Sequence, residues 1–391
     1  MRVLHVIEGM HQGGAESLIL EHVRHAAPDV DTLVCALNRG GPALEEARSL
    51  GARTFVLAKG GNHLGGLGRL VGLMRAEGVQ IAHGHNPTGA LYATAAGRWA
   101  GVDAIVRTEH SIHYPGRHSA LYGAVLEPAL TLLDRRVICV CEAVRLSHVR
   151  RLPWARDRFV TILNGISSAP ATQPRSSVRR DLGLDPADRV AITVGSLTRQ
   201  KAQQVLIEAF ADVARRLPGA RLLIAGDGPL REPLVRQAAA AAPEGVIRFL
   251  GRRDDAPELM GAADVFVLSS VREGLSVTLL EAMRGGLPAV VTEIGGSGEA
   301  VSEGETGRVV PVSNPAALAG ALFELLGDPA RASLMGAAGR ERWAREFTAE
   351  RMVRETEALC REGLRSARWG RTRAGADPAG PVAKGDDRAA S

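Results

Sequence analysis

Two glutamates with seven residues between them stand out in the second half of the chain. Glu273 precedes a helical pattern, and Glu281 falls about two turns into it. Because an ionised carboxylate accepts hydrogen bonds from paired hydroxyls, the first could hold the hydroxyls of a sugar and the second the diol of a ribose. The N–H groups from Leu275 through Ser276 to Val277, at the start of this helix, remain available for other ligand oxygens.

A basic loop stands earlier in the same half. The stretch Val194-Gly195-Ser196-Leu197-Thr198-Arg199-Gln200-Lys201 ends an apolar strand and begins a helix, and Gly226-Asp227-Gly228-Pro229 follows the next strand. The carboxyl edge of a parallel sheet is where such folds bind ligands, and Arg199 and Lys201 would stand there as fixed cations for a diphosphate. The alternative is a pair of solvated cations in the first turn of a helix.

A glycine-rich turn also follows the first apolar run of the chain. Gly13-Gly14-Ala15-Glu16 opens a helix, so its bare N–H groups could face a phosphate or another anion. The spacing does not fit G-x-G-x-x-G, which disfavours dinucleotide binding. Since any turn from strand to helix favours glycine, a purely structural role stays open.

The elements that must position these residues form two similar halves. In each half, short β-branched runs alternate with helical patterns, which predicts parallel sheets covered on both faces. The expected strands are Val3–Ile7, Thr32–Leu37, Thr54–Leu57, Ile81–His83, Ala104–Thr108, Val137–Val140, Phe159–Leu163, Val190–Val194, Arg221–Ala225, Ile247–Leu250, Val265–Leu268 and Ala289–Thr292.

These patterns predict an α/β protein with two Rossmann-like domains. The first covers residues 1–166, a linker rich in Ser, Pro and Ala covers 167–188, and the second domain covers 189–364. Helices are expected from Pro315 to Leu364, with Asn314 as an N-cap. Residues 365–391 lack an apolar period and are predicted to be a disordered tail.

The paired glutamates, the Gly-Asp-Gly-Pro turn and the basic loop together resemble retaining glycosyltransferases of family 4, which have the GT-B fold, with two domains facing each other across a cleft. The resemblance covers the chain to about Leu364. It implies that His110, Glu273 and Lys201 are catalytic, with His110 near the anomeric carbon, and we expect Arg199 to act with them. It implies that the donor is bound by Gly13, Gly14, Ser196, Gly226, Gly228, Gly274, Leu275, Ser276 and Glu281.

The chain departs from that family at two positions. Ser196 stands where the family usually has arginine, and Arg199 is the neighbouring cation that could replace it. Ala202 stands where glycine is common after the lysine. Asn164-Gly165 resembles the family's hinge before the second domain, and the helix near residues 343–364 resembles the one that crosses back to the first domain.

The resemblance implies transfer of a sugar from a nucleotide-diphosphate sugar to an acceptor with retention of configuration. The first domain would bind the acceptor, which could be a glycan, a lipid-linked molecule or a small molecule. No metal or other cofactor is expected, because the eleven histidines lack His-Glu-x-x-His spacing. The alternatives are a nucleotide-sugar epimerase of the same fold and a non-catalytic glycosyltransferase-like subunit.

Composition restricts partners and location. The net charge is only +5 and 4% of residues are aromatic, which disfavours nucleic-acid binding. The N-terminal run reads as a strand rather than a signal peptide, no apolar run is long enough to span a bilayer, and the four cysteines are expected as buried thiols, so we expect a cytoplasmic protein. The arginine-rich segment from Arg145 to Arg158 is expected to be solvated, with peripheral contact to an anionic membrane as the alternative.

Overall fold

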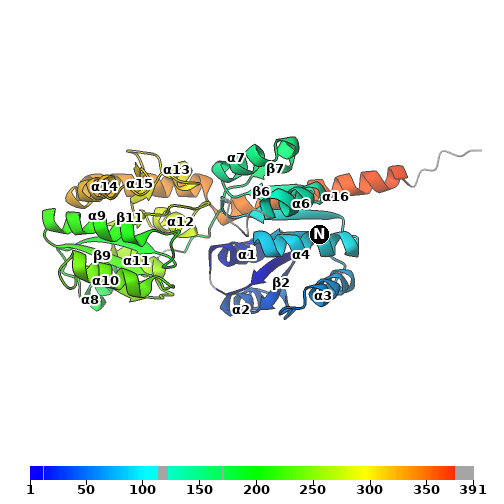
Figure 1. Ribbon diagram of the computed structural model, residues 1–391, viewed down its shortest axis with the longest axis horizontal. Coiled ribbons are helices and arrows are strands. Elements are labelled where there is room, and N and C mark those ends of the chain that lie inside the picture. Colours follow the sequence, from blue (N-terminus) through cyan, green and yellow to red (C-terminus); the bar gives the residue numbers. More distant parts are fainter. Residues whose placement is uncertain (12, 113–121, 170, 375–391) are drawn as a thin grey trace, which may run out of the picture.

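The computed structural model describes residues 1–374 except 12, 113–121 and 170, and it forms two α/β domains side by side (Figure 1). All strand pairs are parallel. The α/β prediction is therefore confirmed. Each sheet is buried on both faces, which explains the continuous apolar runs of its strands.

The N-terminal sheet has seven strands in the order β3-β2-β1-β4-β5-β6-β7. The strands are β1 Arg2–Gly9, β2 Asp31–Arg39, β3 Arg53–Val56, β4 Ile81–His85, β5 Ala104–Glu109, β6 Arg136–Cys139 and β7 Phe159–Thr161. The described helices of this domain are α1 Gly14–Arg24, α2 Pro42–Ser49, α3 His63–Ala76, α4 Asn86–Ala100, the π-helical turn η1 Tyr122–Leu126, α6 Glu127–Leu133, α7 Glu142–Arg151 and the 3₁₀ segment η2 Pro153–Arg158.

The C-terminal sheet has six strands in the order β10-β9-β8-β11-β12-β13. They are β8 Arg189–Val194, β9 Ala220–Ala225, β10 Ile247–Gly251, β11 Val265–Leu268, β12 Ala289–Thr292 and β13 Gly307–Val310. The helices after β7 are α8 Arg175–Asp181, α9 Gln203–Arg216, α10 Arg231–Ala241, α11 Ala256–Ala262, α12 Val277–Arg284, α13 Ser297–Ala300, α14 Pro315–Gly327, α15 Pro329–Glu346 and α16 Ala349–Ala374.

The strand order fixes where a ligand can bind. In each sheet the order reverses once, between β1 and β4 in the N-terminal sheet and between β8 and β11 in the C-terminal sheet. Loops leaving the carboxyl ends of such strands diverge to opposite faces and leave a crevice between them. The Gly13-Gly14 turn follows β1, the basic loop follows β8, and the Glu273 loop follows β11, so both crevices carry the residues expected to do chemistry.

Helix α16 returns from the second domain to the first. Its side chains Met352, Val353 and Cys360 pack with Val3 of β1 and Ile81 of β4 in one apolar core of the N-terminal domain. Figure 1 shows α15 on the C-terminal domain and α16 running on along the N-terminal domain. The expected crossing helix is therefore present, and the chain joins the two domains twice.

The domain limits differ from those expected. Helix α8 lies inside the expected linker, where Arg175 pairs with Asp264 at 2.6 Å and Val178 is buried, so this part of the segment packs on the second domain. Helix α16 continues to Ala374, beyond the expected end of structure at residue 364, because its sequence has no proline and only two glycines over this stretch. The rest of the expected tail, 375–391, lies outside the described residues. Strand β13 was missed because its Gly307-Arg308-Val309-Val310 stretch is short and lies at an edge of the sheet.

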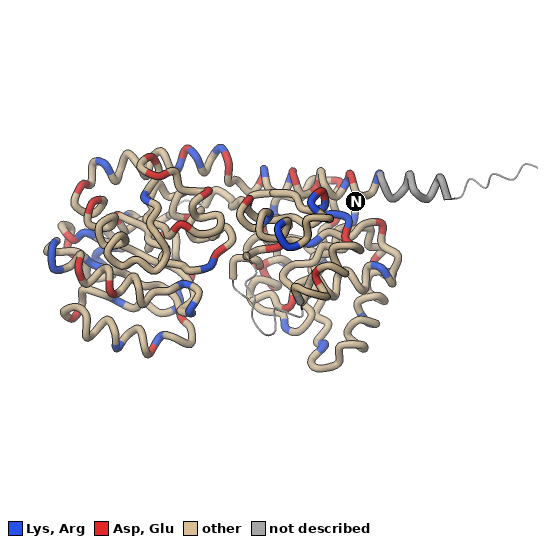
Figure 2. The backbone as a smooth tube through the Cα atoms, turned by 45° about the horizontal axis from the view of Figure 1, so that its top comes forward, with Lys and Arg blue, Asp and Glu red and all other residues tan. Residues whose placement is uncertain are grey.

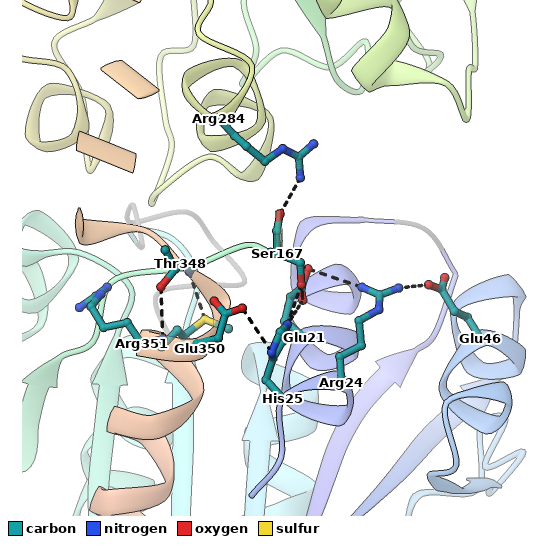
Figure 3. Close-up of polar contacts among 11 residues, drawn as sticks. Glu21, Arg24, His25, Glu46, Ser167, Arg284, Thr348, Glu350 and Arg351 are labelled. Atoms are coloured by element: carbon teal, nitrogen blue, oxygen red, sulfur yellow. Dashed lines mark hydrogen bonds and ion pairs between the residues drawn. The ribbon is translucent and has the colours of Figure 1, made fainter. Parts of the chain in front are cut away.

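The first crossing is tied to both domains by Ser167 (Figure 3). Its main-chain N–H donates to Glu21 of α1 at 3.2 Å, its hydroxyl contacts the same carboxylate, and Arg284 of α12 donates to its carbonyl at 2.8 Å. His25 of α1 contacts the Ser167 hydroxyl at 2.8 Å and lies 3.6 Å from Glu350 of α16. One residue therefore links α1 with the end of α12, while His25 extends the network to α16.

The second crossing packs backbone against backbone beside the expected hinge. Ile166 pairs with Thr348 in an isolated β-bridge, and a Cβ at Gly165 would lie 2.0 Å from the carbonyl oxygen of Thr348. Only glycine permits so close an approach. The Asn164 side chain donates to the carbonyl of Leu275 in the second domain at 2.8 Å. The Asn164-Gly165 pair therefore contacts both the segment around Thr348, between α15 and α16, and the loop before α12.

Candidate active site

A cleft of about 740 Å³ separates the two domains at the carboxyl ends of their strands. The N-terminal domain lines it with the first turn of α1 and with His110, and the C-terminal domain lines it with the loops after β8, β9, β10 and β11. The expected site residues that line the cleft are Gly13, Gly14, His110, Ser196, Lys201, Gly226, Glu273, Leu275, Ser276 and Glu281.

Lys201 and Glu273 form an ion pair in this cleft. Their side chains meet at 2.6 Å and keep only 14% and 13% of their surface exposed, and Ser270 donates to the same carboxylate oxygen at 3.2 Å. Partial exclusion of water strengthens such charges relative to a surface pair. The arrangement fixes one cation and one anion side by side, where the cation can meet a diphosphate and the anion can meet hydroxyl groups.

The basic loop is held by close backbone packing. A Cβ at Gly226, where φ is +138°, would lie 1.9 Å from the carbonyl oxygen of Gly195, and one at Gly228 would lie 2.6 Å from that of Leu197. Leu197 also donates its N–H to the carbonyl of Asp227 at 2.9 Å. The Gly-Asp-Gly turn therefore packs directly against the backbone of the basic loop. Gly228 contacts that loop but does not itself line the cleft.

Ala202 follows the lysine in a conformation that favours glycine. Its φ of +49° lies in the left-handed region, which costs an L-residue with a Cβ about 1 kcal/mol or more. Ser269 holds this turn by donating to the carbonyls of Lys201 at 2.9 Å and Ala202 at 3.2 Å. The structure thus explains why glycine is common after the lysine in the family that the sequence resembles.

Helix α12 aims its N-terminus at the cleft and carries Glu281 about one turn after its first residue, Val277, rather than the two turns expected. Leu275, Ser276 and the first residue of the helix line the cleft, so a positive helix end faces it. Burial raises the pKa of Glu281 above its ordinary value, while nearby Arg284 acts in the opposite direction. A partly buried carboxylate that lines the cleft is suited to receive hydroxyl donors.

The two domains touch at the site itself. Gly274 approaches the backbone of His110 so closely that a Cβ on it would lie 2.1 Å from the His110 carbonyl oxygen. A Cβ on Gly14 would lie 3.5 Å from the side chain of Val277, the first residue of α12. The N-terminus of α1 and the N-terminus of α12 therefore face each other across the cleft, with Lys201 among the residues that line it.

His110 follows β5 and reaches the cleft from the N-terminal domain. Burial lowers its pKa to about 4, and nearby Glu109 acts in the opposite direction. Its Nε2 atom lies 3.2 Å from Nδ1 of His85, a buried residue of β4. At neutral pH the ring is uncharged, and as far as the described residues show, Nδ1 is the nitrogen left for a substrate.

A second pocket of about 720 Å³ adjoins the cleft within the N-terminal domain. It shares His11, Glu16 and Asn86 with the cleft and extends to Glu8 and Arg39. Burial raises the pKa of Glu16. Asn86 adopts φ of +60°, which asparagine tolerates better than most residues, and this turns the chain sharply from β4 into α4.

Comparison with known proteins agrees with this geometry. The family described as Glycosyltransferase Family 4 matches residues 12–169, and the family described as Glycosyl transferases group 1 matches residues 174–342. Alpha-maltose-1-phosphate synthase of Mycolicibacterium smegmatis is 30% identical over 314 residues, which are 73% of this chain and 80% of that protein. The chain belongs to glycosyltransferase family 4.

Two further similarities place this family 4 member among known proteins. N-acetyl-alpha-D-glucosaminyl L-malate synthase of Bacillus anthracis is 28% identical over 196 residues, and the match spans only 50% of this chain and 51% of that protein. The solved structure of Anabaena Alr3699/HepE in complex with UDP and glucose aligns with a TM-score of 0.84 at 20% identity and covers 93% of this chain and 100% of that one. The likeness to that structure supports the GT-B fold.

Three expected site residues of this family 4 member do not line the cleft. Gly228 packs against the basic loop, and Gly274 packs against the backbone of His110. Arg199 is exposed and lies outside the lining, whereas Arg252 and Arg253, which the sequence analysis did not single out, line the cleft after β10. Their position directly after Gly251, the last residue of β10, could have identified them from the sequence, because ligands bind at the carboxyl ends of parallel strands. Arg253 is bound to Asp255 at 2.5 and 2.7 Å, which raises the pKa of the guanidinium.

Five histidines close together in the sequence, His83, His85, His110, His113 and His118, invite a metal-site interpretation, although they lack His-Glu-x-x-His spacing. His83 and His85 do not line the cleft but are buried in the N-terminal domain. Within the described part of the chain, one group of three, His5, His83 and His85, brings ring nitrogens within 4.8 Å of one another. Of the other three, His110 reaches the cleft, and His113 and His118 lie outside the described residues.

Surface features bear on the expected partners. Figure 2 shows basic and acidic residues interspersed over both domains rather than one continuous basic stripe along the described chain. Among the described residues, no helix combines the length and the apolar character needed to cross a bilayer. All four cysteines are buried and unpaired, as expected.

Proposed function

We propose that this chain transfers a sugar from a nucleotide-diphosphate sugar to a hydroxyl-bearing acceptor, with retention of anomeric configuration. The observation that carries the proposal is the Lys201–Glu273 pair at 2.6 Å in the interdomain cleft. The helix N-termini of α1 and α12 face the same cleft. One fixed cation and two positive helix ends suit a leaving diphosphate, and the neighbouring anion suits the sugar hydroxyls.

In the proposed reaction the bond between the anomeric carbon and the β-phosphate oxygen breaks. Lys201 and the N–H groups of Gly13 and Gly14 stabilise the negative charge that develops on the diphosphate. The acceptor oxygen bonds to the anomeric carbon on the same face, and its proton passes to an oxygen of the departing diphosphate. Glu281 holds the ribose and Glu273 holds the sugar, so the protein contributes orientation and charge rather than a nucleophile.

The acceptor enters through the 720 Å³ pocket of the N-terminal domain in this proposal. Glu8 receives hydrogen bonds from Asn38 at 3.4 Å and Thr88 at 3.3 Å, and Arg39 contributes a cation. Carboxylate, amide and guanidinium groups together suit a polyhydroxyl acceptor. A glycan, a lipid-linked saccharide and a small hydroxylated molecule share this chemistry.

We also propose peripheral contact with an anionic membrane through the segment around α6, α7 and η2. These elements pack on one another and expose apolar side chains that include Leu132, Leu146 and Trp154, exposed by 59%, 38% and 54%. Arg150 and Arg156 are exposed beside them. Exposed apolar and basic side chains together are typical of interfacial binding. Sedimentation with anionic vesicles at low salt tests this, and a protein that stays in the supernatant excludes it.

The function is tested with a panel of UDP-, GDP- and ADP-sugars. The donor is expected to raise the melting temperature, since a ligand at 100 times its Kd adds about 2.7 kcal/mol of stability. Release of nucleoside diphosphate should follow when an acceptor is present, and Glu281→Ala should lose both effects. Conversion of the donor sugar without an acceptor would identify an epimerase, and the absence of any donor binding would identify a non-catalytic subunit.

A further inference from the structure

Five histidines lie together in the N-terminal domain, between its sheet and α16. His5, His22, His83 and His85 are exposed by 8% or less, and His110 extends the group to the cleft. His5 comes from β1, His83 and His85 from β4, and His22 from α1. Thr356, Glu357 and Cys360 of α16 close the group from outside, around a cavity of about 10 Å³ that His5, His22 and His83 also line.

Three of these rings form a continuous chain that ends in the cleft. Nδ1 of His5 lies 2.9 Å from Nε2 of His85, and Nδ1 of His85 lies 3.2 Å from Nε2 of His110. Both are hydrogen-bonding distances between ring nitrogens, although the second is at the long end. His83 lies beside this chain, with its ring centroid 4.3 Å from that of His85, but its Nε2 contacts Thr108 at 2.7 Å instead.

The rings in the chain are neutral. Burial lowers the pKa of His5 and His85 well below the ordinary value, and it lowers that of His110 to about 4. A neutral imidazole has one N–H donor and one acceptor nitrogen. Each hydrogen bond along the chain therefore dictates the direction of the next.

We propose that His85 and His5 are positioning residues that set the tautomer of His110 in the cleft. If His85 donates from Nδ1, then His110 must accept at Nε2 and carry its proton on Nδ1. His85 must in turn accept at Nε2 from Nδ1 of His5. In the opposite direction all three protons shift to the other nitrogen, and Nδ1 of His110 presents a lone pair. The proposal rests on the function proposed above, in which His110 meets the transferred sugar.

A metal site is the competing explanation for this cluster, since His5, His83 and His85 are close enough to share an ion. Three neutral rings would leave a divalent cation without a balancing charge in a buried place, which is costly. Glu357, the carboxylate beside them, already accepts from the N–H of Ala27 at 2.9 Å and lies 3.3 Å from Arg361. The hydrogen-bonded chain leaves no such charge unbalanced.

The test is the tautomer of His110, read by multiple-bond ¹H–¹⁵N NMR on nucleotide-free protein labelled at histidine. The resonance of His110 is assigned by its loss in His110→Gln. His5→Phe keeps a ring but removes the nitrogens that reach His110 only through His85, and it should change the tautomer populations of His110. His5→Asn places an amide at the position of Nδ1 and should restore them. His83→Gln is the matched control, because it changes an equally buried ring outside the chain and should leave the spectrum of His110 unchanged.

Turnover gives the second readout. His5→Phe and His85→Gln should lower kcat roughly three- to tenfold, the effect of losing one hydrogen bond, with unchanged affinity for nucleoside diphosphate. If the His110 spectrum is unaltered in both His5→Phe and His85→Gln, the proposed positioning role of His5 and His85 is wrong. The same conclusion follows if the native protein binds one equivalent of zinc that His83→Ala does not bind. If His110→Ala keeps full turnover, the role of His110 in the proposed function fails, whereas the NMR result still decides whether His5 and His85 set its tautomer.

Discussion

Substituting Gly274 by alanine adds one methyl group, and we expect it to lower the rate of catalysis much more than the affinity for nucleoside diphosphate. Gly274 lies in the loop before α12 and touches the backbone of His110 in the other domain. An added Cβ would lie 2.1 Å from the His110 carbonyl oxygen, whereas ordinary contact begins at 3.4 Å. Gly274→Ala therefore requires a shift of about 1.3 Å, the difference between these two distances. The domains must move apart, or the Glu273 loop must retreat from its position.

The magnitude follows from that displacement. A misplacement of about 1 Å between reacting groups costs roughly 100-fold in rate. We expect kcat of Gly274→Ala to fall by about two orders of magnitude. Binding of nucleoside diphosphate should change less, by roughly threefold to tenfold, because Lys201 and Glu281 both belong to the C-terminal domain and only the N–H groups of Gly13 and Gly14 would move away. Overpacking at a site that can relax by domain opening should cost at most about 1–3 kcal/mol of stability.

The assay compares initial rates at saturating donor, diphosphate affinity by calorimetry and the melting temperature. Gly298→Ala is the matched control, since a Cβ at Gly298 meets no atom within 4 Å and its helix α13 also lies in the C-terminal domain. The control should behave like the native protein in all three measurements. A Gly274→Ala variant whose kcat stays within threefold of native would show that this contact does not set the catalytic geometry.

Three further predictions concern stability and charge. Burial lowers the pKa of His22 to about 4, so the stability that its neutral form contributes is complete above pH 6.5 and is lost as the pH falls toward 4. Urea unfolding of the native protein should therefore lose about 2 kcal/mol more between pH 7.5 and 5 than that of His22→Gln, and parallel losses would contradict this. Gly165→Ala should lower stability by about 1–3 kcal/mol, because its Cβ would lie 2.0 Å from the Thr348 carbonyl oxygen; an unchanged melting temperature would show that the hinge relaxes freely. Lys201→Ala should lower kcat at least 100-fold while Arg199→Ala stays within threefold, and equal losses would restore Arg199 to the site.

The fold was largely predictable from local patterns. The runs Val265–Leu268 and Ala289–Thr292 coincide with β11 and β12, because a strand buried on both faces must be apolar throughout its length. Asn314 caps α14 as expected, accepting from the N–H of Ala317 at 3.0 Å. Helix α8 was missed because it is short and is held by packing on the second domain. The extension of α16 was missed because its charged sequence has no apolar period and continues a helix that is already formed.

Part of the site was also predictable, since the carboxyl ends of parallel strands converge. That rule places Lys201 and Glu273 on one edge of one sheet, and the structure joins them at 2.6 Å. The same rule did not distinguish Arg199 from Arg252, because the direction of a side chain on a loop depends on how neighbouring loops pack.

The sequence by itself determined the strands except β13, the parallel sheets and the residues at their carboxyl ends, because each depends on burial and on neighbours in the chain. Only the tertiary structure decided which groups meet: Gly274 against His110, Ser167 between α1 and α12, and the chain from His5 through His85 to the cleft. These contacts join residues 25 to 164 positions apart, from His85 with His110 to Gly274 with His110. No local pattern encodes them, since they arise from strand order and from the two crossings between domains.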